Sequence, residues 1–281
     1  MNKEDVVIVV PVHRATPKEY EIDALKQMLK ILGEYHITFV CPFNLNLDIY
    51  RSIFKNFNKE FCVQNFDKQY FKNYTAYNKF CLSSEFYQAF SNYEYMLICH
   101  LDAWVFKDEL LYWCNQGYDY IGAPLSKKSK IALNLGNINA GNGGFSLRKI
   151  SSMIKLTNTD IRNKKLNNYK SLKSVFFAKR KKRLISNIIN IPIFLFFYIF
   201  QFFIKWQFIQ NEDLIIGYYS TKYMPEFKIA PDNIAEKFAL EYNTKKIYKK
   251  ENFVLPFGCH NPSFYIYLIY KESIKKENIH A

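Results

Sequence analysis

The feature that most constrains the fold is a continuous run of β-branched residues at positions 6–10, almost at the start of the sequence. A run that is apolar at every position is typical of a parallel strand whose two faces are both covered. Helical spacing of apolar residues follows over 17–32, with Thr16 as the expected N-cap, and a second apolar run covers 36–41. We therefore expect the chain to open with a β-α-β unit whose strands pair in parallel.

Helical and strand-like segments keep alternating further along the chain. We expect helices at 49–57, 74–93, 109–114 and 211–219, and strands at 60–67, 95–99, 118–124, 145–148 and around Ala230. The Asn- and Gly-rich segment 134–144 is expected to be a loop. This order predicts an α/β fold with a Rossmann-type, mostly parallel central sheet flanked by helices. The 281 residues suffice for one such domain with a substantial insertion.

The basic residues are unevenly distributed. The net charge is +14, but residues 161–211 hold 11 Lys or Arg and no acidic residue, and the rest of the chain is nearly neutral, with 28 basic and 25 acidic residues. We therefore expect a basic and apolar helical insertion at 155–210 between two parts of one α/β domain, 1–154 and 211–281. A protein that binds nucleic acid along its surface would carry its charge more broadly, so nucleic acid is not an expected partner.

The six cysteines form no Cys-x-x-Cys pair. This spacing argues against zinc knuckles and disulfide scaffolds and favours buried thiols in a reducing cytoplasm. The apolar run at 6–10 is too short for the core of a signal peptide, and no small-residue cleavage site follows it, so we expect no secretory signal there.

His100 and Asp102 come directly after the expected strand at 95–99. Ligands of α/β sheets bind at the carboxyl ends of the strands, and a carboxylate there can hold a hard divalent cation together with substrate phosphates. The alternative for Asp102 is that it caps the following turn. The motif alone leaves the two about even.

Two further motifs contain residues suited to a binding site. Asn142, Gly143 and Gly144 precede the expected strand at 145–148, and paired glycines allow the backbone to come close to a bound molecule. A plain turn is the alternative. Glu212 and Asp213 stand at an expected helix start, where they can supply a general base or cap the helix favourably for its dipole.

Single histidines and an arginine complete the candidate residues. His260 lies in a late loop, where an imidazole can ligate a metal or transfer a proton, although a lone histidine is more often structural. His13 and Arg14 follow the first strand, where they could meet a nucleotide or its phosphates.

Taken in order, these motifs resemble the GT-A fold of nucleotide-sugar glycosyltransferases. Three segments are more specific: Leu-Asp-Ala-Trp-Val-Phe at 101–106, Gly-Tyr-Asp-Tyr-Ile-Gly-Ala-Pro at 117–124 and Gly-Asn-Gly-Gly-Phe-Ser-Leu-Arg at 141–148. They look like a family of little-characterised, glycosyltransferase-like bacterial proteins of surface-polysaccharide loci. The resemblance covers residues 5–150 and 210–265 and leaves the basic insertion out.

The resemblance implies a divalent cation, Mn²⁺ or Mg²⁺, held with the donor diphosphate by a motif of the Asp-x-Asp type. Asp102 matches the ligand carboxylate of that motif, and His100 stands where the motif has its first Asp. His260 matches a late histidine that completes the metal site in related folds. Asp213 would be the base that deprotonates the acceptor hydroxyl, with Glu212 as the second candidate.

The remaining implied roles concern the donor, a nucleotide sugar. It would be bound mainly by residues 1–154, with the acceptor meeting residues 211–281. The residues expected around the nucleotide, the phosphates and the donor sugar are His13, Arg14, Asn78, Lys79, His100, Asn142, Gly143 and Gly144.

The insertion has the composition of a membrane-binding segment. A polybasic stretch is followed by an aromatic-rich apolar stretch, a pattern that favours attachment to an anionic membrane face. The apolar part is shorter than the ~20 residues of a span, so we expect it to lie in the interface; a core or oligomer-interface helix is the alternative. The residues expected at the membrane are Lys179, Arg180, Lys181, Lys182, Arg183, Phe196, Phe197 and Trp206.

These observations lead to one expected function and two alternatives. We expect a glycosyltransferase, cytoplasmic and peripheral on the inner face of the membrane, that acts on a surface-polysaccharide or lipid-linked glycan acceptor. A nucleotidyltransferase would need a glycine-rich phosphate loop after the first strand, and residues 12–15 contain no glycine. A non-enzymatic membrane or nucleic-acid adaptor would not depend on Asp102 or Asp213.

Overall fold

The computed structural model describes residues 1–125, 141–158, 211–265 and 268. Nearly all of the expected insertion, including residues 179–183, Phe196, Phe197 and Trp206, lies outside these residues, so its membrane role stays a prediction. In the part of the chain that is described, no helix combines the length and the apolar character needed to cross a membrane.

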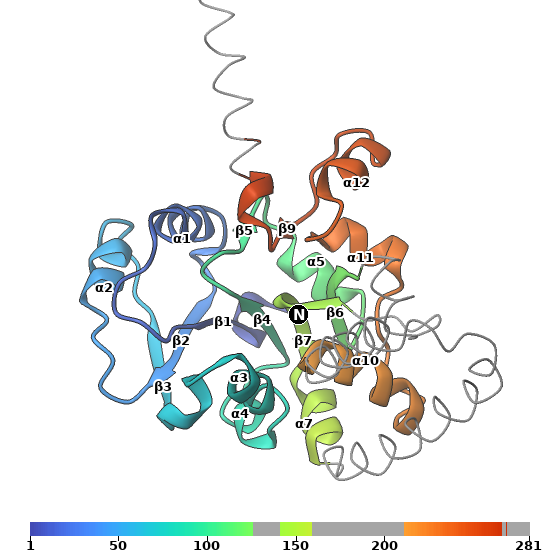
Figure 1. Cartoon of the computed structure of the whole chain (residues 1–281), viewed down its shortest axis with the longest axis horizontal. Coiled ribbons are helices and arrows are strands. Elements are labelled where there is room, and N and C mark those ends of the chain that lie inside the picture. Colours follow the sequence, from blue (N-terminus) through green and yellow to red (C-terminus); the bar gives the residue numbers. More distant parts are fainter. Residues whose placement is uncertain (126–140, 159–210, 266–267, 269–281) are drawn as a thin grey trace, which may run out of the picture.

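The core of the fold is a six-stranded sheet in the order β3-β2-β1-β4-β7-β6 (Figure 1). The strands are β1 (Val6–Pro11), β2 (His36–Pro42), β3 (Cys62–Phe66), β4 (Tyr95–Cys99), β6 (Tyr120–Pro124) and β7 (Gly141–Lys149). The first four pair in parallel, and β7 is antiparallel to both of its neighbours. All strands except β7 therefore run in one direction, which confirms the prediction of an α/β fold with a mostly parallel, mixed sheet.

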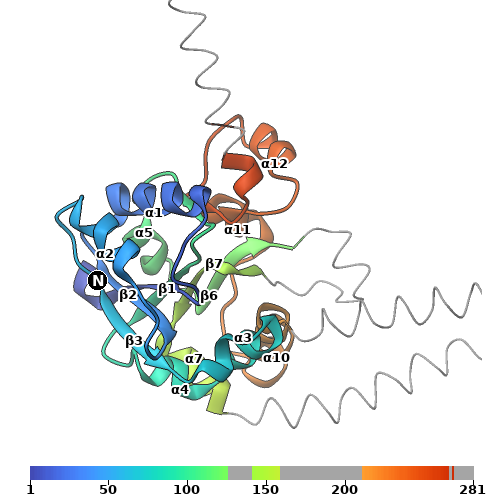
Figure 2. The same ribbon diagram turned by 60° about the vertical axis from the view of Figure 1, so that its left-hand side comes forward.

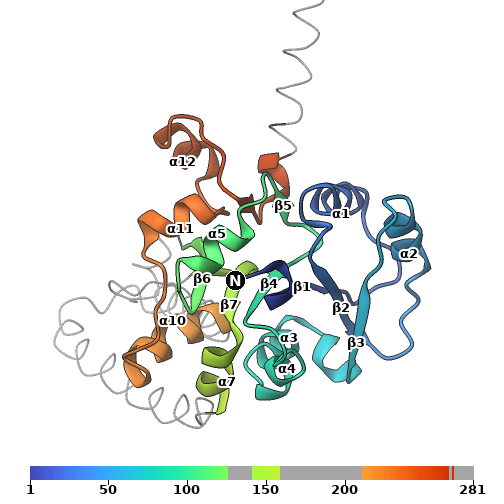
Figure 3. The same ribbon diagram turned by 180° about the vertical axis from the view of Figure 1, so that it is seen from behind.

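Alternate residues of β1 face opposite sides of the sheet. Val6, Ile8 and Val10 pack in one apolar cluster with α1 (Glu19–Leu32), α2 (Asp48–Lys55), α5 (Leu110–Asn115) and α11 (Asp232–Phe238). Val7 and Val9 pack in a second cluster with α3 (Tyr74–Phe80), α4 (Ser84–Gln88), α7 (Ile150–Asn158) and α10 (Glu212–Tyr223). The two sets of helices cover opposite faces of the sheet (Figures 1 and 3). This double cover explains why the run at 6–10 is apolar at every position.

A small second sheet brings the C-terminal part of the domain to the end of β4. It consists of β5 (Trp104–Val105), β9 (Gly258–Cys259) and β8 (Ala239–Leu240) in that order. Cys259 pairs with Trp104 on one side and with Leu240 on the other. The residues that follow β8 and β9 therefore lie next to the turn after β4. Shorter helical segments are α12 (Thr244–Lys250) and two 3-10 turns, Lys3–Asp5 and Lys68–Phe71.

Two expected helices differ from those observed. The helix expected over 74–93 is two helices, α3 and α4, because the Ser83 side chain accepts a hydrogen bond from Phe86 N at 3.3 Å and starts a new helix. The first helix begins at Glu19 and not directly after Thr16. In the first case, helical spacing of apolar residues continued across a local break; in the second, the residue that precedes the helix is Lys18 and not Thr16.

Two expected strand boundaries also differ. The loop expected over 134–144 ends sooner, because β7 begins at Gly141 and pairs there with Pro124 of β6. The strand expected around Ala230 is a single bridge between Ile229 and Tyr120.

Candidate active site

Three side chains from distant parts of the chain meet at the carboxyl end of β4. His100 and Asp102 follow β4 directly, and His260 follows β9. One ligand atom from each residue can be chosen so that all three lie within 4.8 Å of one another. The closest contact joins His260 Nε2 to Asp102 Oδ1 at 3.0 Å. The structure thus brings together Asp102 and His260, which were predicted to hold a metal, and His100, which was predicted to bind substrate.

The backbone holds this His-Asp-His cluster from three sides. His100 N donates a hydrogen bond to Gly144 O in β7 at 2.8 Å, and His260 N donates one to Leu240 O in β8 at 2.9 Å. The His100 ring also forms a hydrogen bond with the hydroxyl of Tyr77 in α3, with 3.0 Å between Nε2 and the oxygen. The cluster is therefore fixed by the main sheet, the small sheet and one helix.

The three groups differ strongly in their affinity for protons. Burial alone would lower the pKa of His260, but its contacts with Asp102 and Glu241 outweigh burial and raise that pKa to about 10. Burial opposes ionisation of Asp102, but the hydrogen bond from His260 outweighs it and lowers the pKa of Asp102 to about 2. Burial, together with the charge of His260, lowers the pKa of His100 to about 3. At neutral pH, the metal-free cluster holds a charged His260, an ionised Asp102 and a neutral His100.

The donor set of the cluster fits a divalent cation. Ligand atoms of a six-coordinate Mn²⁺ or Mg²⁺ ion lie about 3–4 Å from one another, and the three atoms here lie within 4.8 Å of one another. Two imidazoles and one carboxylate suit a transition-metal ion such as Mn²⁺ better than Mg²⁺, which prefers oxygen ligands. The Asp102 side chain is 34% exposed, so the cluster is open to solvent.

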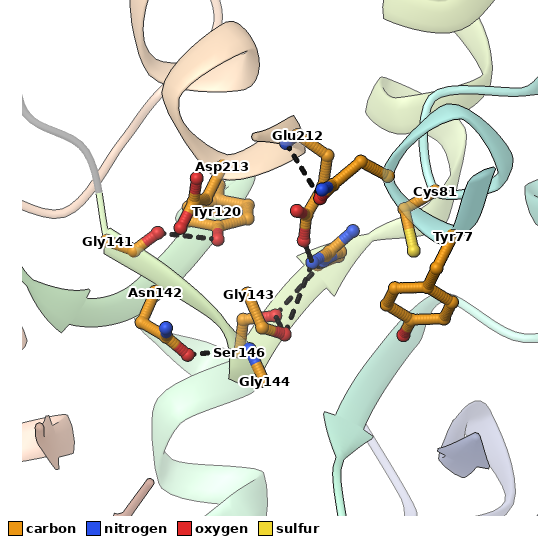
Figure 4. A network of polar contacts seen from close by, with 12 residues as sticks. Tyr77, Cys81, Tyr120, Gly141, Asn142, Gly143, Gly144, Ser146, Glu212 and Asp213 are labelled. Carbon is orange, nitrogen blue, oxygen red and sulfur yellow. Dashed lines mark hydrogen bonds and ion pairs between the residues drawn. The ribbon is translucent and has the colours of Figure 1, made fainter. Parts of the chain in front are cut away.

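Gly143 and Gly144 have no side chains, and other residues of the site fill the space beside them. A Cβ added to Gly144 would lie 2.4 Å from His260 Nε2, and one added to Gly143 would lie within van der Waals overlap of the Glu212 carboxylate. Asn142 holds the turn of this strand, because its Oδ1 accepts a hydrogen bond from Gly144 N at 2.7 Å. The missing side chains thus admit neighbouring protein groups, His260 at Gly144 and Glu212 at Gly143. Figure 4 shows Gly143 and Gly144 on the side of β7 near the start of α10.

Glu212 forms a buried ion pair. Its Oε1 lies 3.0 Å from the guanidinium of Arg148, whose side chain is fully buried. Arg148 also donates hydrogen bonds to the hydroxyl of Tyr87 at 2.8 Å, to Ser146 Oγ at 3.0 Å and to Gly143 O at 3.3 Å. Figure 4 shows this network beneath the start of α10. The Glu212 carboxylate is therefore held in place by Arg148.

Asp213 has a different environment from its neighbour. Its Oδ1 accepts a hydrogen bond from Leu214 N at 2.7 Å, and Arg148 forms its ion pair with Glu212 and not with Asp213. Burial, followed by repulsion from Glu212, raises the pKa of Asp213 well above its usual range. Its side chain lies close enough to Tyr120 for its charge to act on that hydroxyl (Figure 4). The Asp213 carboxylate is therefore a stronger proton acceptor than an ordinary aspartate.

Comparison with protein-family models places this site in a family without an assigned activity. The model described as "Protein of unknown function (DUF5672)" matches residues 60–260, which is most of the chain and contains the whole His-Asp-His cluster. The chain belongs to the DUF5672 family. No curated protein matches the sequence of this DUF5672 member.

Solved structures with the same fold are glycosyltransferases. Mouse xyloside xylosyltransferase 1 has a TM-score of 0.51 at 11% identity, over 90% of this chain and 96% of that chain. The galactosyltransferase LgtC, solved with donor and acceptor sugar analogues, has a TM-score of 0.48 at 13% identity, over 91% and 86%. Core-mannan synthase A of Aspergillus fumigatus, solved in its Mn/GDP form, has a TM-score of 0.41 at 11% identity, over 53% and 60%. The DUF5672 chain thus spans less than two thirds of the fungal enzyme's length, and at these identities the likeness establishes the GT-A fold alone.

Two residues of α3 expected near the nucleotide point in different directions. Asn78 is buried, and its Oδ1 accepts a hydrogen bond from Glu212 N at 3.2 Å. Lys79 lies on the exposed side of the helix. Figure 2 shows α3 beside α10, which agrees with this contact. Asn78 therefore helps to fix the start of α10.

The two residues expected near the phosphates also differ. His13 is exposed after β1 and lies close enough to His100 for its charge to act on that ring. Arg14 forms an ion pair with Glu21 at the start of α1, and its buried Nε has no hydrogen-bond partner within the described part of the chain. His13 thus lies near the His-Asp-His cluster, and Arg14 is held by α1.

The sequence did not reveal Glu241 as a site residue. Its Oε1 lies 3.7 Å from His260 Nδ1, on the side of the ring opposite Asp102. The two residues are neighbours only because β8 and β9 pair, and both strands are two residues long. A single acidic residue after a short apolar segment carries no local pattern that would single it out.

Proposed function

We propose that this DUF5672 protein is a glycosyltransferase that moves a sugar from a nucleotide-sugar donor to a hydroxyl group of a glycan acceptor. The observation that carries this proposal is the meeting of His100 and Asp102 with His260 beside Gly144, at the carboxyl end of a central parallel strand. Ligands of open α/β sheets bind at this edge. The shared fold is compatible with this activity but does not establish it, because one fold supports many reactions.

His100, Asp102 and His260 would hold the divalent cation, with Mn²⁺ favoured over Mg²⁺ by the two imidazoles. When bound, such a cation stabilises the negative charge that develops on the departing diphosphate. Asp102 supplies the negative charge of the donor set, and the neutral His100 carries a lone pair on one ring nitrogen at neutral pH. The exposed imidazole of His13 would donate a hydrogen bond to a phosphate oxygen of the donor.

Asp213 is the proposed general base. In the reaction, the acceptor oxygen forms a bond to the anomeric carbon, the bond from that carbon to the phosphate oxygen breaks, and the nucleoside diphosphate leaves with the bonding electrons. The hydroxyl proton passes to the Asp213 carboxylate, whose raised pKa makes it a stronger proton acceptor. Glu212 holds the start of α10 through Arg148 and so positions Asp213.

The acceptor is proposed to be a surface-polysaccharide precursor or a lipid-linked glycan at the cytoplasmic membrane face. The support is the sequence of the insertion, with basic residues 179–183 followed by Phe196, Phe197 and Trp206. The test is flotation of the full chain with anionic liposomes. Neutral substitutions at 179–183 should abolish flotation, and unchanged flotation would refute electrostatic membrane binding.

The donor is tested by thermal unfolding of the full chain with a panel of nucleotide sugars, with and without Mn²⁺. A ligand that binds the native state raises the melting temperature by mass action. At least one donor should raise it in the presence of Mn²⁺, and Asp102→Asn should remove the shift. If no donor shifts the melting temperature of the wild-type chain, the proposal fails.

A further inference from the structure

Glu241 faces His260 in a way that its sequence position alone does not explain. Leu240 of β8 pairs with Cys259 of β9 in parallel, so the next residues of the two strands, Glu241 and His260, emerge side by side. Asn261 Nδ2 donates a hydrogen bond to Glu241 O at 2.6 Å and ties the two strand ends together. The small sheet therefore fixes the backbone of both residues.

Each side chain of this pair has one polar atom that lacks a hydrogen bond among the described residues. Glu241 Oε2 and His260 Nδ1 are both buried, and neither has a hydrogen-bond partner in the described part of the chain. The Glu241 side chain is only 14% exposed. A buried carboxylate without hydrogen bonds is costly. Because His260 Nδ1 lies 3.7 Å from Glu241 Oε1, a small movement would let the carboxylate accept the hydrogen bond that Nδ1 lacks.

The two nitrogens of the His260 ring have different neighbours. Nε2 lies 3.0 Å from Asp102 Oδ1, whereas Nδ1 lies on the side of Glu241. Glu241 does not belong to the cluster of possible metal ligands, which among the described residues consists of His100, Asp102 and His260. Glu241 can therefore reach the metal site only through the His260 ring.

We infer that Glu241 is a positioning residue that accepts the Nδ1 proton of His260 and so turns the Nε2 lone pair toward Asp102 and the cation. The inference rests on the proposed metal site and adds a residue to it. Metal-binding histidines commonly donate their second ring N–H to a carboxylate, which fixes the tautomer and the ring orientation. The arrangement Glu241, His260, Asp102 supplies the three parts of such a chain.

The test compares the Mn²⁺ affinity of the full chain between the wild type and its variants. The electron paramagnetic resonance signal of free Mn²⁺ measures how much of the ion is bound. Glu241→Leu should weaken Mn²⁺ binding by about 10–100-fold. Glu241→Gln should have a smaller effect, because its amide oxygen can still accept the hydrogen bond from Nδ1. Glu236→Gln is the matched control, since it removes the same charge from a carboxylate that pairs with Lys250 in place of His260, and it should bind like the wild type.

The expected order of Mn²⁺ affinities, with the wild type above Glu241→Gln and Glu241→Gln above Glu241→Leu, separates a positioning role from a structural one. Circular dichroism checks the fold, and if Glu241→Leu does not fold, Glu241→Ala takes its place in the comparison. Equal affinities of wild type, Glu241→Leu and Glu241→Gln would overturn the inference about Glu241 alone, provided that Asp102→Asn loses Mn²⁺. If Asp102→Asn binds Mn²⁺ as the wild type does, both the proposed metal site and the inference are wrong.

Discussion

His260 Nε2 lies 3.0 Å from Asp102 Oδ1, although 158 residues separate the two in the chain. The contact is made by β9, which pairs with β5 directly after the turn that contains Asp102. A contact of this kind between a charged imidazole and a carboxylate occupies the lone pairs that a cation would use. A proton and a metal ion therefore compete for the same atoms of His260 and Asp102.

Mn²⁺ binding should become tighter as pH rises. His260, with its pKa raised to about 10, is protonated at neutral pH and must release this proton before it can ligate a cation. Asp102, whose pKa is about 2, and His100, whose pKa is about 3, are already deprotonated at neutral pH, so they add no pH dependence there. Apparent affinity should rise by about tenfold per pH unit between about pH 6 and pH 8, measured by titration at each pH. An affinity that does not vary across this range would contradict the assignment of His260.

Gly144→Ala should weaken Mn²⁺ binding, whereas Gly143→Ala should not. The new Cβ at Gly144 would lie 2.4 Å from His260 Nε2 and force the ring away from Asp102. The Cβ at Gly143 would displace the Glu212 carboxylate instead. We expect a loss of about tenfold or more for Gly144→Ala, measured by Mn²⁺ titration, and near wild-type affinity for Gly143→Ala. Equal effects of the two variants would show that Gly144 does not act through His260.

Asp213→Asn should lower the turnover rate while leaving donor binding intact. The amide cannot accept the acceptor proton, so the rate should fall by about 10²–10⁴-fold, measured with the donor identified by thermal unfolding. The melting-temperature shift with that donor and Mn²⁺ should persist. Asp23→Asn, at an exposed position of α1, is the matched control. A turnover rate for Asp213→Asn equal to that of the control would exclude Asp213 as the base.

Glu212→Gln should destabilise the fold. The substitution leaves the Arg148 guanidinium fully buried without its charged partner. Breaking a buried ion pair from one side costs about 3–5 kcal/mol, and urea denaturation measures this loss. Glu34→Gln, which breaks the exposed pair with Lys59, should hardly change the denaturation midpoint. Similar midpoints for the two variants would mean that the ion pair with Arg148 contributes little to stability.

Much of the central sheet could be predicted from the sequence. The runs at 6–10 and 95–99 are apolar at every position because both faces of the sheet are covered, and this pattern survives in the sequence as an uninterrupted apolar stretch. His100 and Asp102 could be placed for the same reason, since they come directly after such a run. Local breaks were harder to foresee: the helix expected over 74–93 is interrupted because one serine hydroxyl, that of Ser83, caps a new helix.

The parts of the site that depend on the small sheet could not be predicted. Glu241 and His260 meet through strands of two residues each, which are too short to leave a periodic pattern. Arg148 was visible only as the end of a glycine-containing motif, and its buried pairing with Glu212 depends on how α10 packs against β7. Long-range packing of this kind joins residues that nothing in the local sequence relates.

The most direct test of the account is release of nucleoside diphosphate from a nucleotide-sugar panel by the full-length chain, compared between the wild type and Asp102→Asn. The account predicts that Mn²⁺ stimulates release from at least one donor in the wild type and that Asp102→Asn abolishes this stimulation, because the variant loses the carboxylate that faces His260. Release from no donor at any Mn²⁺ concentration, or equal Mn²⁺-dependent release by the wild type and Asp102→Asn, would contradict it.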